Sequence, residues 1–140
     1  MTSFQIKINN QSIENNTILS FANSQSIPTI SFDHPSDKYY TIIMSDTDAP
    51  SSKNPVNAKF LHMLVINNNQ TLVPYHPPAP PIGSGYHRYQ FRLFEQPNHF
   101  TDLKLPTENK QIIRPKFNHD KFSSEHQLKE LSQITFKTQR

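Results

Sequence analysis

Cysteine is absent from the 140-residue sequence. The chain therefore offers no disulfide framework, no thiolate metal ligand and no thiol nucleophile, and this composition fits a reducing compartment. The first ten residues, MTSFQIKINN, contain no apolar stretch like that of a secretory signal. The longest apolar run, residues 63–66, is far too short to cross a bilayer. We expect a cytoplasmic protein with no integral membrane association.

Concentrated charge is also lacking. The 14 lysines and arginines outnumber the 11 aspartates and glutamates, which gives a formal net charge of +3. The basic residues are scattered, and no cluster of four occurs. Proteins that bind nucleic acid usually present a concentrated basic face. We therefore expect no nucleic-acid partner.

The chain has the length of one domain, residues 1–140, and no repeat or linker divides it. Period-two alternation predicts strands at residues 4–8 and 27–32, and β-branched and aromatic residues predict another at 39–46. One helix is predicted around residues 123–131, followed by a last strand at 134–138. These short strands and their turn-rich connections predict a mostly β domain, an antiparallel sandwich or barrel-like sheet.

Two further stretches predict buried strands. Residues 59–67 are apolar on both faces, which is typical of a central strand covered on both sides. Strict alternation divides this strand into Phe60, Leu64 and Ile66 on one face and Leu61, Met63 and Val65 on the other. Residues 87–94 are amphipathic instead. Their apolar face carries His87, Tyr89, Phe91 and Leu93, while Arg88, Gln90 and Arg92 are expected to face water.

Four polar residues lie inside these strands or close to their ends. Asp46 ends the strand 39–46 on its buried side, and Asp48 stays on that side if the chain remains extended, although both could simply cap a turn before Pro50. His62 lies within the doubly apolar strand, where it is either a ligand or a core histidine paired with a backbone carbonyl. His87 begins the amphipathic strand at a predicted cleft edge.

A proline-rich loop precedes His87. The stretch PYHPPAPPIGSGYHRYQF, residues 74–91, holds five of the twelve prolines and both glycines. It could be an exposed polyproline ligand for another protein. The alternative, which we favour, is the stiff wall of a pocket, because prolines fix φ and remove N–H donors while glycines allow close approach.

Three motifs in order resemble the phosphatidylethanolamine-binding protein family, which includes the Raf-kinase inhibitor proteins and plant flowering regulators. They are DTDAPS (46–51), KFLHMLVIN (59–67) and PPAPPIGSGYHRYQFRLFEQ (77–96), and a weaker echo is RPKFNHDKF (114–122). The resemblance covers roughly residues 40 to 96. It implies a large central β-sheet packed on a second sheet, with few short helices, and a domain that lacks the family's usual C-terminal helix.

The resemblance also implies a small pocket for an anion, a phosphate or a phospholipid head group. Carried over residue by residue, its ligand-binding positions are Asp46, Asp48, His62, His87 and Tyr89, lined by Pro50, Phe60 and Pro81. Thr47, Phe60 and Ala79 depart from the family pattern, which usually has proline, tryptophan and glycine there. We expect no metal and no cofactor.

Two other functions compete with this interpretation. Two aspartates and two histidines could form a metal site or a hydrolase centre, but the sequence has no G-x-S-x-G nucleophile motif, and we expect no enzyme. The second alternative is a kinase or serine-protease inhibitor that acts by protein contact and has a vestigial pocket. The sequence favours a binding protein that could modulate signalling.

Overall fold

The computed structural model describes residues 3–140. A six-stranded sheet in the order β3–β11–β8–β5–β6–β7 forms its centre. Only the pair β3 and β11 is parallel, whereas all other neighbours in this sheet are antiparallel. The strands are β3 (Thr17–Ile18), β5 (Tyr40–Asp46), β6 (Phe60–Ile66), β7 (Gln70–Val73), β8 (His87–Glu95) and β11 (Lys129–Thr138).

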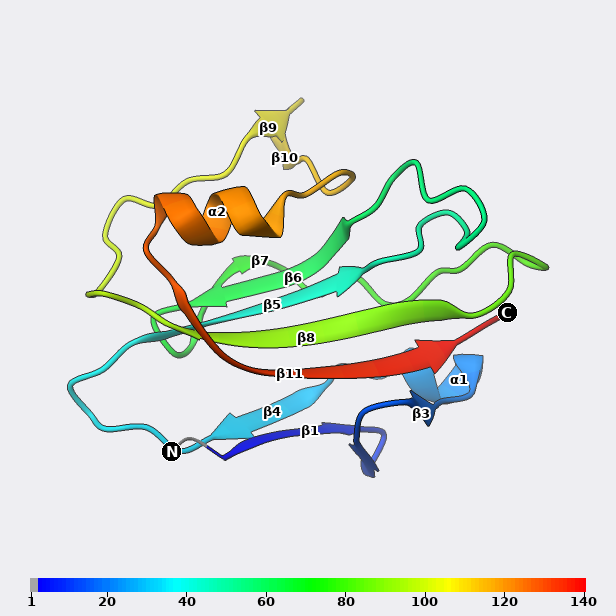
Figure 1. The fold of residues 1–140 in the computed structure, drawn as a ribbon, viewed down its shortest axis with the longest axis horizontal. Coiled ribbons are helices and arrows are strands. Elements are labelled where there is room, and N and C mark those ends of the chain that lie inside the picture. Colours follow the sequence, from blue (N-terminus) through cyan, green and yellow to red (C-terminus); the bar gives the residue numbers. More distant parts are fainter. Residues whose placement is uncertain (1–2) are drawn as a thin grey trace.

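A second, antiparallel sheet of three strands in the order β2–β1–β4 covers one face of the central sheet (Figure 1). The opposite face carries helix α2 and the small hairpin β9–β10 (Figure 1). These elements are β1 (Phe4–Ile8), β2 (Gln11–Ile13), β4 (Thr29–Phe32), β9 (Thr107–Glu108), β10 (Gln111–Ile112), α1 (Phe21–Ser24) and α2 (His119–Glu125). The predicted two-sheet β fold with few short helices is confirmed.

Each face of the central sheet buries its own apolar core. The core between the two sheets is built on aromatic side chains of β8 and β11, where Tyr89 and Phe91 stack on Phe136 with all three fully buried. The core under α2 joins Phe94 of β8 to Phe122 of the helix. The central strands are therefore covered on both sides, as the doubly apolar sequence of β6 predicts.

A β-bulge in β6 changes which of its residues share a face. Met44 pairs with Met63 and the next residue, Ser45, pairs with Leu61, so His62 has no partner on β5. The extra residue bends the strand and reverses the alternation after it. Met63 and Val65 consequently enter the core between the sheets, while the other core holds Leu61, Leu64 and Ile66. Strict alternation predicts that Leu61 lies on the other face of the strand from Leu64 and Ile66, and that prediction is wrong.

The helix begins four residues and ends six residues earlier than the sequence predicts. Asn118 caps α2 by accepting a hydrogen bond from the amide of Lys121 (3.0 Å), and the helix ends before Gln127, whose φ is +53°. Residues 129–138 cannot continue it because they pair with β8 along their length. Leu131, the last residue of the predicted helix, is instead an exposed residue of β11.

The prediction that Arg92 faces water is also wrong. Its guanidinium packs 5.1 Å from the ring centre of Phe94 and binds Glu130 through Nε and Nη2. Its Nη1 donates to Nδ1 of the buried His119 (2.9 Å). The start of α2 covers this part of the sheet, so only 13% of the Arg92 side chain is exposed.

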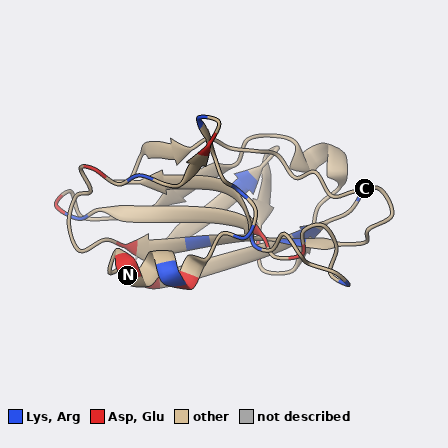
Figure 2. Cartoon of the chain, turned by 90° about the horizontal axis from the view of Figure 1, so that it is seen from above, with Lys and Arg blue, Asp and Glu red and all other residues tan. Residues whose placement is uncertain are grey.

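Lysines and arginines are interspersed with aspartates and glutamates along the chain (Figure 2). Within residues 3–140, no helix has the length and apolar character needed to span a membrane.

Candidate functional site

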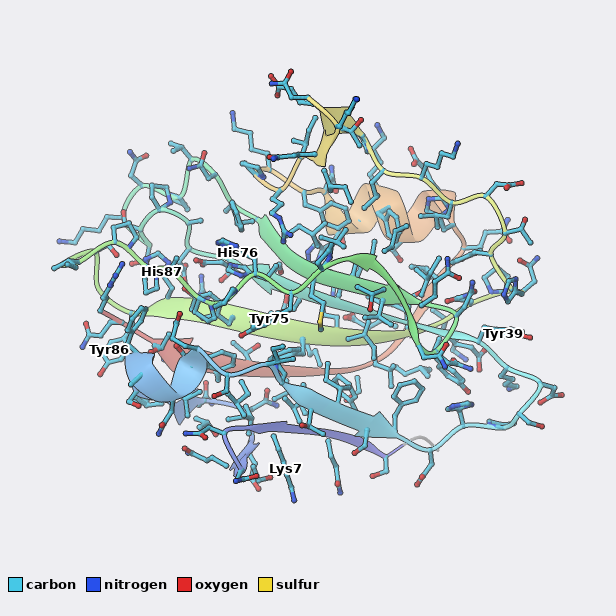
Figure 3. The ribbon with its side chains drawn as sticks, turned by 180° about the vertical axis from the view of Figure 1, so that it is seen from behind. Lys7, Tyr39, Tyr75, His76, Tyr86 and His87 are labelled. Atoms are coloured by element: carbon cyan, nitrogen blue, oxygen red, sulfur yellow. The ribbon has the colours of Figure 1, made fainter. Side chains whose placement is uncertain are left out.

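Three strand ends bring the predicted site residues together. Asp46 ends β5, and because β6 and β8 run antiparallel to β5, it pairs with Phe60 near the start of β6 and with Tyr89 near the start of β8. Figure 3 shows His76 and His87 at the same end of the molecule, opposite Tyr39. The polar residues at these ends of β5, β6 and β8 therefore lie close together, at one end of the core between the sheets.

A cavity of about 270 Å³ lies at this meeting point. Its lining comprises Asp46, Ala49, Pro50, Asn57, Phe60, His62, His76, Ala79, Pro81 and His87. Six of the eight residues predicted to form the site are in this set. Whether they contact a ligand stays a prediction.

His87 is held by hydrogen bonds at both ring nitrogens. Its Nδ1 lies 2.7 Å from Oδ2 of Asp46, and its Nε2 lies 2.9 Å from Oγ of Ser84. The Ser84 hydroxyl also lies 2.7 Å from the carbonyl oxygen of Pro81, which can only accept. Its single proton therefore goes to Pro81, and His87 Nε2 must be the donor to Ser84 in this arrangement.

Asp46 is almost fully buried. Burial raises the pKa of its carboxyl, and the hydrogen bonds from His87 and from the Asp48 amide oppose that rise. Since His87 Nε2 already carries a proton, a further proton must lie in the 2.7 Å contact between Asp46 Oδ2 and His87 Nδ1, because two lone pairs would repel each other there. With the proton on either partner, the pair as a whole carries no net charge.

His62 occupies the bulge of β6 and is 3% exposed. Its Nδ1 bonds to the carbonyl oxygen of His76, while the His76 amide donates to the carbonyl of His62 (2.9 Å). Burial lowers the pKa of His62 to about 4, so its ring is neutral near pH 7. His62 thus pairs with a backbone carbonyl, as the core alternative predicts, and it also lines the cavity, while its role as a ligand stays a prediction.

The proline-rich loop forms the wall of this cavity rather than an extended free segment. Gln25 Nε2 donates to the carbonyl of Pro78 (2.8 Å), and the Tyr75 hydroxyl donates to the carbonyl of Ser24 (3.2 Å). Gly83 and Gly85 adopt φ values of +79° and +86°. Side chains with a Cβ rarely adopt these angles, so the glycines allow the turn that carries Ser84 back to His87.

Two predicted site residues lie outside the lining. The Asp48 carboxylate accepts three hydrogen bonds from Arg88, from its backbone N (2.7 Å), Nε (2.9 Å) and Nη2 (2.8 Å). Burial alone would raise the pKa of Asp48, but these bonds hold it below its ordinary value. Tyr89 lies beneath His62 with ring centres 5.3 Å apart, and its buried hydroxyl has no hydrogen-bond partner among residues 3–140.

Other residues of the site are not among those predicted from the sequence. His76 and Asn57 line the cavity, and Ser84 fixes the His87 ring. Arg114 donates to the carbonyls of Leu61 and His62 (both 3.1 Å) and of Pro74 (3.0 Å). His76 could have been found, because it lies within the stretch already interpreted as a pocket wall.

A larger hollow of about 700 Å³ lies beside the hairpin β9–β10 and shares only Phe60 with the cavity. Its other lining residues come from Pro74 and residues 108–115 and include Glu108, Lys110 and Arg114 but no histidine. The smaller cavity is the better candidate site because buried, hydrogen-bonded titratable groups converge there. Within the described part of the chain, no three histidine, aspartate or glutamate side chains converge as a metal site would require.

The sequence profile of the phosphatidylethanolamine-binding protein family matches residues 8–71 and 66–136. The chain belongs to this family. A phosphatidylethanolamine-binding protein homologue of Acanthamoeba polyphaga mimivirus is 46% identical over 139 residues, covering 98% of this chain and 97% of the viral protein.

Solved structures show the same fold. The phosphatidylethanolamine-binding protein of Plasmodium vivax superimposes with a TM-score of 0.79 at 22% identity, covering 99% of this chain and 85% of that one. A carboxypeptidase Y inhibitor, solved in complex with its proteinase, gives a TM-score of 0.78 at 23% identity, with coverage of 97% and 82%.

Acidification should destabilise the protein because it buries neutral histidines. Burial lowers the pKa of His62 to about 4 and that of His119 to about 3, from 6.5. Between pH 6.5 and pH 4 the unfolded chain binds more protons at these two positions, so the free energy of unfolding falls as pH falls. Each histidine contributes at most about 1.4 kcal/mol per pH unit. The raised pKa of Asp46 acts in the opposite direction just above pH 3.8.

Urea unfolding at pH 7, 6 and 5 measures this dependence. The variant His119→Asn should show a shallower loss of stability than the wild type, since one of the two groups is gone. A free energy of unfolding that stays constant over this range would contradict the assignment of two buried neutral histidines.

Proposed function

We propose that the protein binds small phosphate-bearing molecules or phospholipid head groups in the cavity between β5, β6, β8 and the proline-rich loop. The observation that carries this proposal is the convergence of three imidazoles, from His62, His76 and His87, on one small cavity. Imidazoles are polar groups that can fix the orientation of a ligand in a concave site. Membership of the phosphatidylethanolamine-binding protein family supports the same class of ligand.

The charges around the cavity are compatible with an anion despite the presence of Asp46. Because Asp46 and His87 share a proton, the carboxylate is compensated within the pair. Arg114 lies behind the strand, where it donates to backbone carbonyls and has no carboxylate partner among the described residues. Its positive charge acts on His62 and His76. A bound anion would experience this uncompensated charge.

We further propose that the protein binds its ligand without transforming it and acts in the cytoplasm. Ser84, His87 and Asp46 are linked in the order found in serine hydrolases. However, the Ser84 proton goes to Pro81, and Ser84 is not among the residues that line the cavity. A ligand in the cavity would meet His87 and Asp46 but not the serine hydroxyl.

Binding can be tested by following the imidazole resonances of His62 and His87 by NMR during titration with inorganic phosphate and with phosphoethanolamine. Both should shift with millimolar ligand. His87→Ala should weaken binding about tenfold or more, because it removes the partner of Asp46 and leaves that carboxylate uncompensated. The matched control His34→Ala, an exposed histidine outside the lining, should bind as the wild type does.

Resonances that stay unmoved at tens of millimolar ligand would show that the cavity does not bind phosphate. If His87→Ala fails to fold, His87→Gln retains a side-chain donor near Asp46 and permits the same comparison.

The proposal that the protein is not a hydrolase can be tested separately. A fluorophosphonate probe that labels activated serines should leave Ser84 unmodified, and p-nitrophenyl acetate should be hydrolysed no faster than by Ser84→Ala. Mass-spectrometric detection of the probe on Ser84 would overturn the proposal that the protein is not an enzyme.

A protein partner is the second candidate, as a kinase or serine-protease inhibitor whose pocket is vestigial. Three large apolar side chains beside lining residues are exposed, namely Val56 (54%), Ile82 (80%) and Tyr86 (43%). The fold likeness to a carboxypeptidase Y inhibitor makes a peptidase the first partner to test. Inhibition of carboxypeptidase Y that is lost in Ile82→Ser, but kept in the control Ile18→Ser at an exposed position on β3, would favour this function. No inhibition at micromolar protein would count against it.

A further inference from the structure

The hydrogen bond between His62 and His76 determines which nitrogen of the His62 ring carries its proton. The carbonyl oxygen of His76 can only accept, so His62 Nδ1 must be the donor. In a neutral imidazole the other nitrogen is then a lone-pair acceptor. Nε2 of His62 therefore presents a lone pair, not an N–H.

His62 Nε2 has no hydrogen-bond partner within residues 3–140. It is not one of the fully enclosed polar atoms without a partner, so protein does not seal it off. The His62 ring lines the cavity. By contrast, both nitrogens of His87 and both carboxylate oxygens of Asp46 are engaged by protein groups. Nε2 is thus an unused acceptor in the cavity wall, next to groups that are already satisfied.

The surroundings of His62 keep its ring neutral. The rings of His76 and Tyr89 lie with their centres 5.5 Å and 5.3 Å from that of His62, and the charge of Arg114 opposes its protonation. The nearby carboxylate, Asp46, is committed to His87 and the Asp48 amide. Burial lowers the pKa of His62 to about 4, and no lysine or arginine is among the lining residues. A fully ionised phosphate would therefore place an oxygen lone pair against the lone pair of Nε2.

We propose that the cavity selects anions that bring their own proton, with His62 Nε2 accepting a hydrogen bond from the P–OH group of a singly charged phosphate monoester. This inference rests on the proposed binding function and adds the chemical class of the ligand. Among the phosphate ligands of the proposed function, His62 is then the specificity-determining residue, because it favours monoesters such as phosphoethanolamine over diesters that have no hydroxyl. A diester can bind only if Nε2 stays without a hydrogen bond or if the ring takes up a proton, and each of these lowers the affinity of the diester.

Two ligands of equal charge test the proposal directly. At pH 5.5 methyl phosphate is mainly a monoanion with one P–OH, since the second pKa of a phosphate monoester is about 6. Dimethyl phosphate is a monoanion without one. Protonating a ring whose pKa is about 4 at this pH costs about thirtyfold in affinity. Isothermal titration calorimetry should therefore show methyl phosphate binding at least about tenfold more tightly.

Further ligands separate the possible origins of such a preference. Propyl phosphate should bind like methyl phosphate, which excludes the bulk of a second methyl group as the cause. Glycerophosphoethanolamine is a diester that carries an ammonium donor, and it should bind as weakly as dimethyl phosphate. If either diester binds within about threefold of methyl phosphate, the P–OH group is not what the site recognises and the proposal is overturned.

Matched variants assign the effect to His62. His62→Gln supplies an amide N–H at this position and should reduce the preference for methyl phosphate to within about threefold. His34→Gln makes the same change at an exposed histidine outside the lining, and it should keep the preference. A preference that survives in His62→Gln would overturn the proposal.

Imidazole ¹⁵N shifts give a second measurement that needs no variant. On saturation with methyl phosphate at pH 5.5, the His62 ring should remain neutral, with Nε2 accepting a hydrogen bond. Conversion of His62 to an imidazolium would show that the protein supplies the proton and would overturn the proposal. If no phosphate binds even at tens of millimolar, the binding function itself fails, which is distinct from equal binding of monoester and diester.

Discussion

The reciprocal hydrogen bonds between His62 and His76 are the contact on which the candidate site depends. They join the bulge of the central strand β6 to the loop that begins at Pro74, so the strand and the pocket wall are positioned as one unit. The same bonds fix the tautomer of His62 and therefore the polarity that it presents to the cavity. Arg114 supports this unit from behind by donating to the carbonyls of Leu61, His62 and Pro74.

Six strands were predicted, because the pattern of apolar and polar residues is a local property; they are β1, β4, β5, β6, β8 and β11. Residues 4–8 form β1 within the predicted bounds, and residues 87–94 lie within β8. The bulge at His62 was not predictable, since every residue from Leu61 to Ile66 except His62 is apolar and suits either face. The helix was misplaced for a related reason. Leu131 fits a helical stripe, but pairing of residues 129–138 with β8 overrides that local preference.

The site was predictable where strand ends determine it. Asp46 and His87 meet because the register of β5 and β8 brings those ends together. Asp48 was assigned to the same face on the assumption of an extended chain, and its capture by Arg88 depends on a turn that alternation does not describe. Ser84 reaches the His87 ring because Gly83 and Gly85 adopt positive φ angles in a turn. The sequence alone does not specify the path of that turn.

Strand β11 lies between β8 and β3, and β3 comes from residues 17–18 near the start of the sequence. A ribosome must therefore synthesise nearly all of these residues before the central sheet can be completed. Until residues 129–138 emerge, the long strand β8 keeps one unpaired edge, and an unpaired edge is open to pairing with other nascent chains. The order of its strands thus makes completion of the central sheet depend on the synthesis of residues 129–138.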